Sequence, residues 1–131
     1  MIYVDSSALL KLLFEEDESD TLRRWLTAHA SVAVVSSELA RVEVSRVCRR
    51  IDSGRINAAR ALLAGLDLIP MTSDVINEAA EMGSTMLRSL DAIHLSTALS
   101  IREDLTALVA YDRRLSDAAT AAGIETVRPC A

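Results

Sequence analysis

The sequence contains few of the residues that staple small proteins together or stack on nucleic-acid bases. It has 2 cysteines in 131 residues, and aromatic residues make up 3% of the chain. Cys48 lies within a helical pattern and Cys130 precedes the last residue, so there is neither a CxxC metal pair nor a disulfide framework. The shortage of cysteine fits a reducing compartment, and the shortage of aromatics leaves little surface for stacking single-stranded bases.

Long apolar runs are also missing. No stretch reaches the ~18 apolar residues of a membrane span, and Ile2 to Val4 follow Met1 without the basic region of a signal peptide. We therefore expect a cytoplasmic protein. Hydrophobic residues make up 50% of the chain and charged residues 25%, as in a globular domain. Because no linker or repeat interrupts the sequence, we expect one domain over residues 1–131.

Positive charge is scarce overall. The formal net charge is -5 at pH 7, which argues against a basic protein that coats nucleic acid. Lys11 is the only lysine, and the other basic residues are arginines. Arginine suits phosphate groups because its planar fork matches their oxygens, although an arginine preference also follows from genome composition.

Short apolar runs alternate with helical periods along the whole chain. The runs, apolar on both faces as in a buried parallel sheet, predict strands at residues 2–4, 32–35, 67–71, 107–111 and 125–128. The periodic segments predict helices at residues 7–15, 19–29, 37–52, 55–66, 73–87, 90–102 and 113–122. This order predicts an α/β/α sandwich around a mainly parallel five-stranded sheet, with ligands at the carboxyl ends of the strands.

Several helix ends carry cap signals. Ser7 is the expected N-cap of the first helix, Ser89 can cap the sixth, and Ser73 starts the fifth. Gly123 is expected to stop the last helix.

Acidic residues stand where this layout would collect a ligand. Asp5 and Asp112 follow the first and fourth strands, and Asp91 opens the sixth helix. Glu43 lies at the edge of an apolar helical stripe, whereas Glu38 points nearly opposite to that stripe. Each acid also has an ordinary interpretation: helix capping for Asp5 and Asp91, an ion pair with Arg46 for Glu43, and a turn for Asp112.

The segments around these acids resemble the PIN-domain nucleases, specifically the VapC-type toxins of bacterial toxin-antitoxin pairs. The similar segments are "MIYVDSSALLKL", "SSELARVEVSRVCRR", "LRSLDAIHLSTAL" and "LVAYDRRLSDAATAAGI", which place the family's acids at Asp5, Glu43, Asp91 and Asp112. One departure is Ala110, where the family often has serine or threonine two residues before the fourth acid.

The resemblance implies a Mg²⁺- or Mn²⁺-dependent endoribonuclease that is neutralised by a VapB-type antitoxin. If four carboxylates meet within ~5 Å, each pair repels by roughly 3 kcal/mol at an effective dielectric near 20, and a hard divalent cation removes that repulsion. We expect Asp5 and Asp91 as the principal ligands, with Glu43 and Asp112 acting through water or on a second ion. Ser6 and Ser7 would steady the site by hydrogen bonds.

The resemblance also implies a homodimer that forms a heterotetramer or larger assembly with the antitoxin. The mean hydropathy of +0.23 is high for a small domain and fits a partly covered surface. Candidates for an antitoxin groove are Phe14, Leu22, Trp25 and Leu26, for which packing in the core is the alternative.

Three further residues stand near the acids in the sequence. His94 follows Asp91 by one helical turn, and we expect it to pack beside the acids rather than to bind metal. Arg113 and Arg114 directly follow Asp112 and are candidates for contacts with RNA phosphates, with a solvated surface as the alternative.

The sequence leaves two other functions open. A phosphorylation-dependent receiver domain also uses strand-end acids and Mg²⁺, but it generally pairs two acids after the first strand and carries a late lysine, whereas Lys11 is early. A catalytically inert PIN-like module is the other alternative, favoured slightly by Ala110 and opposed by the complete set of acids.

Overall fold

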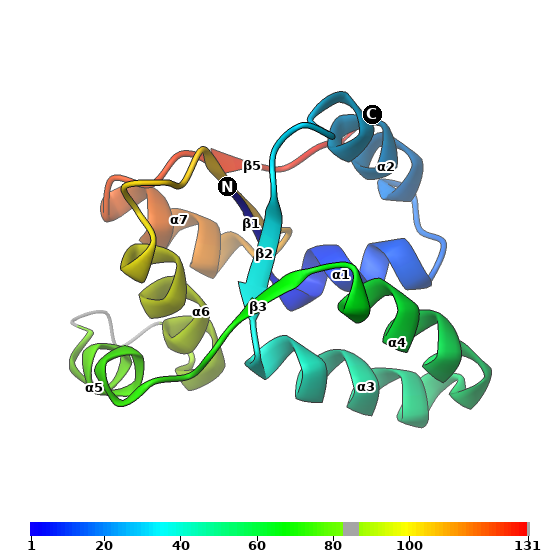
Figure 1. Ribbon diagram of the computed structural model, residues 1–131, viewed down its shortest axis with the longest axis horizontal. Coiled ribbons are helices and arrows are strands. Elements are labelled where there is room, and N and C mark those ends of the chain that lie inside the picture. Colours follow the sequence, from blue (N-terminus) through cyan, green and yellow to red (C-terminus); the bar gives the residue numbers. More distant parts are fainter. Residues whose placement is uncertain (83–86, 131) are drawn as a thin grey trace.

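The fold is built around a parallel sheet that helices cover on both faces (Figure 1). The computed structural model describes residues 1–82 and 87–130. Its strands are β1 (Ile2–Val4), β2 (Val34–Ser37), β3 (Asp67–Ile69), β4 (Ala107–Val109) and β5 (Thr126–Val127). Its helices are α1 (Ser6–Leu13), α2 (Ser19–Ala28), α3 (Leu39–Ile51), α4 (Ile56–Ala64), α5 (Ser73–Glu81), α6 (Ser89–Ser100) and α7 (Arg113–Ala121), with a short 3-10 helix η1 (Ser53–Arg55).

The strand order within the described residues is β3-β2-β1-β4-β5, and every pairing is parallel. The chain adds β2 and β3 on one side of β1, and β4 and β5 on the other. The direction of winding therefore reverses between β1 and β4, and ligands of open α/β sheets bind beside the strand ends at such a point. Receiver domains have the order 2-1-3-4-5 instead, so the observed order contradicts that alternative.

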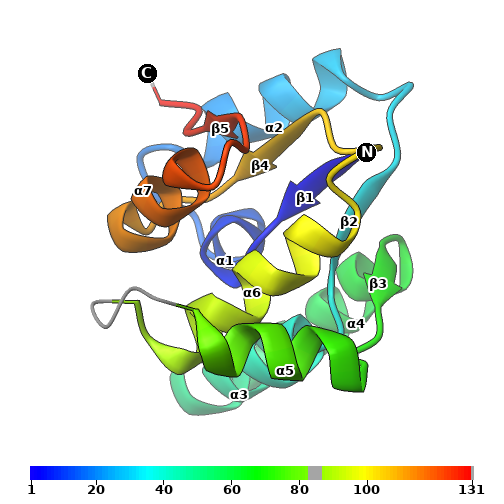
Figure 2. The ribbon, with the colours of Figure 1, turned by 90° about the vertical axis from the view of Figure 1, so that its left-hand side faces the viewer.

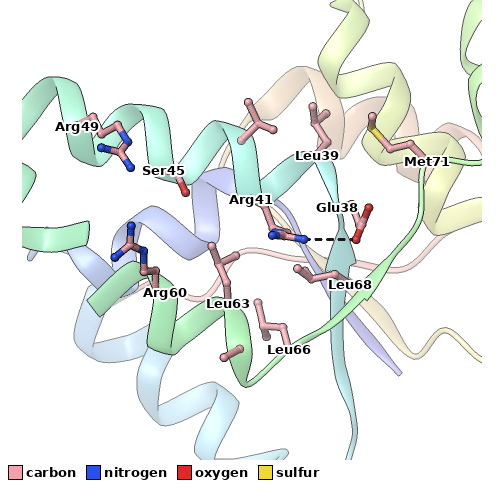
Figure 3. Close-up of a pocket in the computed structure, with 12 residues that line it drawn as sticks. Glu38, Leu39, Arg41, Ser45, Arg49, Arg60, Leu63, Leu66, Leu68 and Met71 are labelled. Carbon is pink, nitrogen blue, oxygen red and sulfur yellow. Dashed lines mark ion pairs between the residues drawn. The ribbon is translucent and has the colours of Figure 1, made fainter. Parts of the chain in front are cut away.

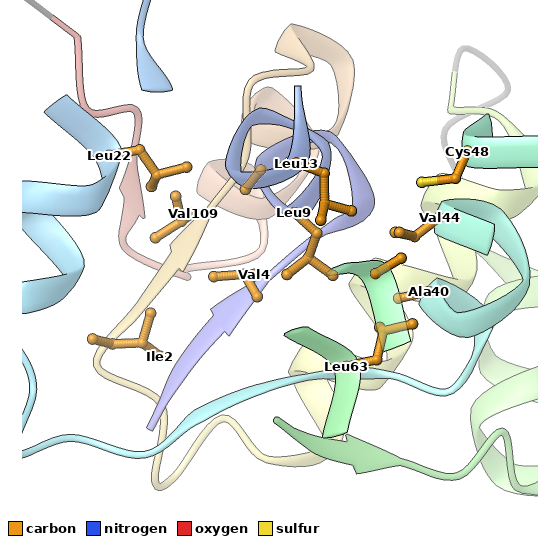
Figure 4. Close-up of a cluster of buried hydrophobic side chains, with 12 residues drawn as sticks. Ile2, Val4, Leu9, Leu13, Leu22, Ala40, Val44, Cys48, Leu63 and Val109 are labelled. Atoms are coloured by element: carbon orange, nitrogen blue, oxygen red, sulfur yellow. The ribbon is translucent and has the colours of Figure 1, made fainter. Parts of the chain in front are cut away.

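Successive side chains of β1 point to opposite faces of the sheet and are buried in two separate cores. Ile2 and Val4 are buried with Leu9 of α1, Val44 of α3 and other apolar residues of α1 to α4 (Figure 4). Tyr3 points to the opposite face, where the buried apolar residues come from the sheet, α6 and α7. Figure 2 shows α5, α6 and α7 covering this second face. Burying one such side chain contributes about 1.5 to 3 kcal/mol, so the two cores hold the three layers together.

The predicted fold class is confirmed, and the sheet is parallel throughout its described strands. The largest error is in β2, which extends to Ser37 instead of ending at Val35. Ser36 and Ser37 pair with Leu68 and Ile69 of β3, and the Ser36 hydroxyl donates a hydrogen bond to the Val4 carbonyl. Polar side chains therefore continue a strand that the apolar pattern ended too early.

Helix boundaries also differ from the predictions. Helix α3 starts at Leu39 rather than at residue 37 because Ser37 belongs to β2. Helix α5 ends at Glu81, and residues 83–86 of the predicted helix lie outside the described residues. Gly123 follows α7 with φ of 85°, which confirms its predicted role as a stop signal. In the described parts of the chain, the helices fall short of the length and apolar character needed to cross a membrane.

Two predicted caps are wrong. Asp5, not Ser7, is the N-cap of α1, because Asp5 has extended backbone angles and its side chain accepts a hydrogen bond from the Ala8 amide. Ser7 already lies inside the helix. Ser89 is likewise the first helical residue of α6, and Arg88 occupies the cap position without a side-chain cap bond.

Candidate active site

Asp5 stands where β1 passes into α1, at the reversal point of the sheet. Its Oδ1 accepts hydrogen bonds from the Ala8 amide at 3.0 Å and from the Ser7 hydroxyl at 2.6 Å. The Ser7 hydroxyl oxygen also accepts a bond from the Tyr111 amide at 3.0 Å. Ser7 thus ties the carboxyl end of β1 to Tyr111, the residue before Asp112.

Asp112 is used in the same way at the start of α7. Its Oδ1 accepts a hydrogen bond from the Leu115 amide at 3.0 Å, which caps the helix, and its Oδ2 lies 3.2 Å from an Arg88 nitrogen. Asp5 and Asp112 therefore each spend one carboxylate oxygen on a helix cap. The capping interpretation and the site interpretation are compatible, because the cap bond uses only Oδ1 of each carboxylate.

Of the four candidate acids, Asp91 has the poorest hydrogen bonding from the described residues. Its Oδ2 is buried and has no hydrogen-bond partner within the described residues. The nearest cation is Arg88, whose Nε lies 3.6 Å from that oxygen, beyond hydrogen-bond distance. Burial raises the pKa of Asp91, and the negative charge of Asp112 raises it further. A carboxylate in this state is ready to accept a cation.

Glu43 is held more firmly. Its Oε1 accepts hydrogen bonds from the Ser6 hydroxyl at 2.7 Å and from His94 Nε2 at 2.7 Å. Burial alone would raise the pKa of Glu43, but the contacts with His94 and Ser6 outweigh burial and lower the pKa. Glu43 therefore turns inward to His94, and the alternative pairing with Arg46 is not observed among the described ion pairs.

The buried position of Asp5 makes its charge costly. The Asp5 residue is 3% exposed. Burial raises its pKa from 3.8 to about 6, although hydrogen bonds from Ser7 and Ala8 oppose the rise, and the negative charge of Asp91 adds to it. The ionised form of Asp5 is thus destabilised unless a positive charge comes close.

The residues fit a divalent cation by their chemistry. All four side chains offer carboxylate oxygens, which Mg²⁺ and Mn²⁺ prefer. Asp91 adds a buried oxygen without a partner. Over residues 1–82 and 87–130, no three acidic, histidine or cysteine side chains are arranged as a ready-made metal centre.

A large hollow lies elsewhere, between α3, α4 and the end of β3 (Figure 3). It has a volume of about 790 Å³. Its polar lining includes Arg41, which pairs with Glu38 at 3.7 Å, and Arg49 and Arg60. None of the four candidate acids lines it. The four acids, together the acidic edge of the molecule, instead lie around the carboxyl ends of the interior strands β1 and β4, and the side chains of Glu43, Asp91 and Asp112 are 17% to 26% exposed.

The residues around the acids are packed into the two cores. His94 is 2% exposed and bonded through both ring nitrogens, to Tyr3 and to Glu43, so the expectation of a packed, satisfied histidine is confirmed. Leu22 is fully buried, and Trp25 packs partly buried against the same core. Ala110 is buried in the other core, so the hydroxyl contacts of the site come from Ser6 and Ser7 instead.

Sequence reasoning missed Tyr3 and Arg88. Arg88 lies three residues before Asp91, a spacing that brings side chains together on a helix and could have signalled the contact. Tyr3 is a polar-tipped residue in an otherwise aliphatic strand, but its partner is 91 residues away in the sequence. Only the folded chain reveals that pairing.

Parallel α/β sheets with acids at the reversal point occur in proteins that bind nucleotides or metal ions. Comparison with known proteins identifies the family. The PIN domain matches residues 2–121. Ribonuclease VapC47 of Mycobacterium tuberculosis is 47% identical, covering 98% of this chain and 97% of the relative. Ribonuclease VapC46 of the same species is 44% identical over 98% of this chain and 97% of the relative.

Solved structures agree on the fold. The crystal structure of M. tuberculosis VapC20, described as a toxin that cleaves the sarcin-ricin loop, has a TM-score of 0.75 at 23% identity, with 98% of this chain and 100% of that chain covered. A toxin-antitoxin complex from Klebsiella pneumoniae has a TM-score of 0.74 at 20% identity, with 98% of each chain covered.

The chain belongs to the PIN-domain family and, within it, to the VapC ribonucleases, the toxins of VapBC toxin-antitoxin systems. The resemblance recognised in the sequence motifs is therefore confirmed. Nucleases of this family typically depend on a metal ion.

Proposed function

We propose that this protein is a Mg²⁺- or Mn²⁺-dependent endoribonuclease, acting in the cytoplasm as one domain, in which Asp5, Glu43, Asp91 and Asp112 hold the cation. The observation that carries the proposal is the buried Oδ2 of Asp91, which has no hydrogen-bond partner among the described residues and lies in the field of the other acids. Leaving a buried charge uncompensated is expensive, so a cation is the expected counterpart.

The four acids have different tasks in this proposal. Asp5 and Asp91 are the principal ligands, and Glu43 and Asp112 act through water or on a second ion. The bound cation supplies a Lewis acid that promotes the attack of water on a phosphodiester and offsets charge on the departing oxygen. The protein orients the carboxylates, chiefly through Ser7 on Asp5 and through Ser6 and His94 on Glu43.

Arg113 and Arg114 are the candidates for holding the RNA. Both are exposed, directly follow Asp112, and make no ion pair with the described residues. A guanidinium group can donate two parallel hydrogen bonds to a phosphate. Two arginines that have no ion pair with the described residues therefore offset the repulsion between the acidic edge and RNA. This local charge reconciles an acidic protein with a polyanionic substrate.

An antitoxin of the VapB type is the proposed inhibitor. An apolar hollow of about 310 Å³ between α1, α2 and α4 is lined by residues that include Leu12, Leu26 and Leu62. Leu26 belongs to the groove expected from the sequence, whereas Leu22 is committed to the core. We expect Leu62→Asp to weaken binding of the cognate antitoxin in a pull-down while metal-dependent cleavage continues; an unchanged complex would place the contact elsewhere.

A homodimer, and a heterotetramer or larger assembly with the antitoxin, completes the proposal. Val42 and Met71 are 56% and 42% exposed and line the same groove between α3 and α4. Large exposed apolar side chains are typical of surfaces that a partner covers. Analytical ultracentrifugation of the toxin alone and with antitoxin would measure both stoichiometries.

Asp5→Asn tests the catalytic proposal directly. We expect the purified wild type to cleave RNA with Mn²⁺, to stop with a chelator, and to lose activity by about 1000-fold or more in Asp5→Asn, because several kcal/mol of charge stabilisation is removed. Asp74→Asn is the matched control, since Asp74 is an exposed acid in the first turn of α5. Cleavage that persists with chelator or in Asp5→Asn would contradict the proposal, and a folded wild type that never cleaves would favour the inert alternative.

The RNA target requires a cellular experiment. Sequencing RNA ends after brief induction of the wild type, beside Asp5→Asn, would show new ends that depend on the acid. Shared ends in both samples would come from other nucleases.

A further inference from the structure

A chain of buried hydrogen bonds runs from the core to Glu43. The Tyr3 hydroxyl lies 2.6 Å from His94 Nδ1, and His94 Nε2 lies 2.7 Å from Glu43 Oε1. Tyr3 is 0% exposed and His94 is 2% exposed. The two rings also pack edge to face, with centroids 5.8 Å apart. This chain links three elements, β1, α6 and α3, and it ends on a candidate cation ligand.

The hydrogens of this chain can be assigned from its ends. Glu43 Oε1 accepts the Ser6 hydroxyl and, as a carboxylate oxygen, has no hydrogen to give, so His94 Nε2 must be the donor. A neutral imidazole that carries its hydrogen on Nε2 accepts at Nδ1. The Tyr3 hydroxyl is positioned to supply that bond. Tyr3 thereby selects the ring form of His94 that can bind Glu43.

We propose that Tyr3 and His94 are positioning residues, which fix the orientation of the Glu43 carboxylate and thereby raise the affinity of the site for a divalent cation. The inference rests on the proposed function, because it requires Glu43 to serve the cation. Partners that hydrogen-bond to a metal ligand from behind restrict its rotation, and their loss typically costs about 10-fold to 100-fold in metal affinity or activity. The Glu43 side chain is 21% exposed, and the bonds from Ser6 and His94 both go to Oε1, which leaves Oε2 for the cation in this proposal.

The contacts of His94 separate this role from simple packing. Ser96 lies two residues along the same helix, is likewise fully buried, and donates a 2.7 Å bond to the Val75 carbonyl on α5. Removing either side chain breaks a buried hydrogen bond of α6. Only His94 contacts Glu43, so Ser96→Ala is the matched control for loss of stability.

The test measures Mn²⁺ binding by calorimetry in wild type, Tyr3→Phe, His94→Leu, His94→Gln and Ser96→Ala. We expect His94→Leu to weaken Mn²⁺ binding about tenfold and Tyr3→Phe to weaken it by several-fold. His94→Gln should recover much of the loss, because its amide can donate near the position of Nε2. Ser96→Ala should bind as the wild type does. Long-range ¹H-¹⁵N spectra of the metal-free wild type should show the His94 hydrogen on Nε2.

Each result decides a different question. If wild type binds Mn²⁺ and cleaves RNA, but His94→Leu and Tyr3→Phe bind Mn²⁺ equally well, the positioning role is overturned and the proposed function stands. If wild type shows no Mn²⁺ binding or cleaves without metal, the proposed function fails and the inference fails with it. Should His94→Leu not fold, Tyr3→Phe, which keeps the packed ring, and His94→Gln carry the same decision.

Discussion

The acidic edge has two halves, Glu43 on one side and Asp91 with Asp112 on the other, and their hydrogen-bond partners differ. In the first half, Glu43 accepts hydrogen bonds from the Ser6 hydroxyl and from the His94 ring, and the pKa of Glu43 is lowered. In the second half, Asp91 and Asp112 share the side chain of Arg88, which is 66% exposed, and one oxygen of Asp91 is buried without a hydrogen bond from the described residues. The core thus stabilises the first half, and a surface side chain stabilises the second.

The difference indicates where a cation contributes most. Glu43 is oriented and charged before any cation arrives, because its partners are fixed by the fold. Asp91 carries a raised pKa and lacks a partner, so its ionised form gains more from a nearby positive charge. We therefore expect the free energy of cation binding to come mainly from the Asp91 half, and the geometry of binding from the Glu43 half.

The largest expected effect compares one acid from each half. Asp91→Asn should lower metal-dependent RNA cleavage by about 1000-fold, and Glu43→Gln by about 100-fold, because removing an uncompensated charge loses more attraction for the cation. The measurement is the initial cleavage rate at a fixed Mn²⁺ concentration, with Mn²⁺ affinity measured on the same samples. Equal losses in both variants, or a larger loss in Glu43→Gln, would show that the two halves do not divide the work in this way.

The second prediction concerns pH and the metal-free protein. The pKa of Asp5 is raised from 3.8 to about 6, so the folded state keeps this proton while the unfolded state releases it. Below pH 4 both states are protonated and Asp5 costs nothing. As the pH rises from 4 to 6 the stability falls, and above the folded pKa the full penalty is up to about 3 kcal/mol.

Chemical denaturation with chelator at pH 4.5, 5.5 and 7 would measure this penalty. Asp5→Asn should remove most of the difference between pH 4.5 and 7, since asparagine caps a helix about as well as aspartate. Saturating Mn²⁺ should reverse the trend in the wild type, because the cation competes with the proton. A wild type that gains stability between pH 4.5 and 7 without metal would contradict the assigned burial of the Asp5 charge.

The sequence predicted the positions of the acids better than their surroundings. An apolar run placed the end of β1, and therefore Asp5, because buried strands leave a strong local pattern. The run at residues 107–111 put Asp112 close after the fourth strand, although β4 ends earlier than predicted, at Val109. The sequence pattern favours Ser7 as the cap of α1, whereas the Ser7 hydroxyl donates to Asp5, because several polar residues in a row offer more than one helix start. Local preference alone does not distinguish among them.

Contacts between segments that are far apart in the sequence cannot be predicted from local sequence patterns. The pairing of Tyr3 with His94 and of Ser6 with Glu43 depends on how β1, α3 and α6 meet at one corner of the fold. The extension of β2 through Ser36 and Ser37 has the same origin, since those serines are held by β3 and Val4 rather than by their own apolar character. Both are consequences of tertiary packing, which overrides local preference.

The smallest expected effect concerns the exposed ion pairs that Arg88 makes with Asp91 and Asp112. Arg88 reaches Asp91 at 3.6 Å and Asp112 at 3.2 Å, and a cation that binds these acids must displace it. An exposed pair of this kind contributes up to about 1 kcal/mol, so Arg88→Gln should strengthen Mn²⁺ binding by no more than about fivefold. The gain should shrink as salt is raised, because salt already screens the exposed guanidinium.

Calorimetry of Arg88→Gln at low and high salt would measure that gain, with Arg102→Gln as the control, since Arg102 is exposed at the other end of α6. A gain confined to Arg88→Gln at low salt would mean that the second half is held by a replaceable counter-ion, as the first half is not. Weaker Mn²⁺ binding in Arg88→Gln would mean instead that Arg88 orients Asp91 and Asp112 for the cation, and both halves would then be preorganised by the protein.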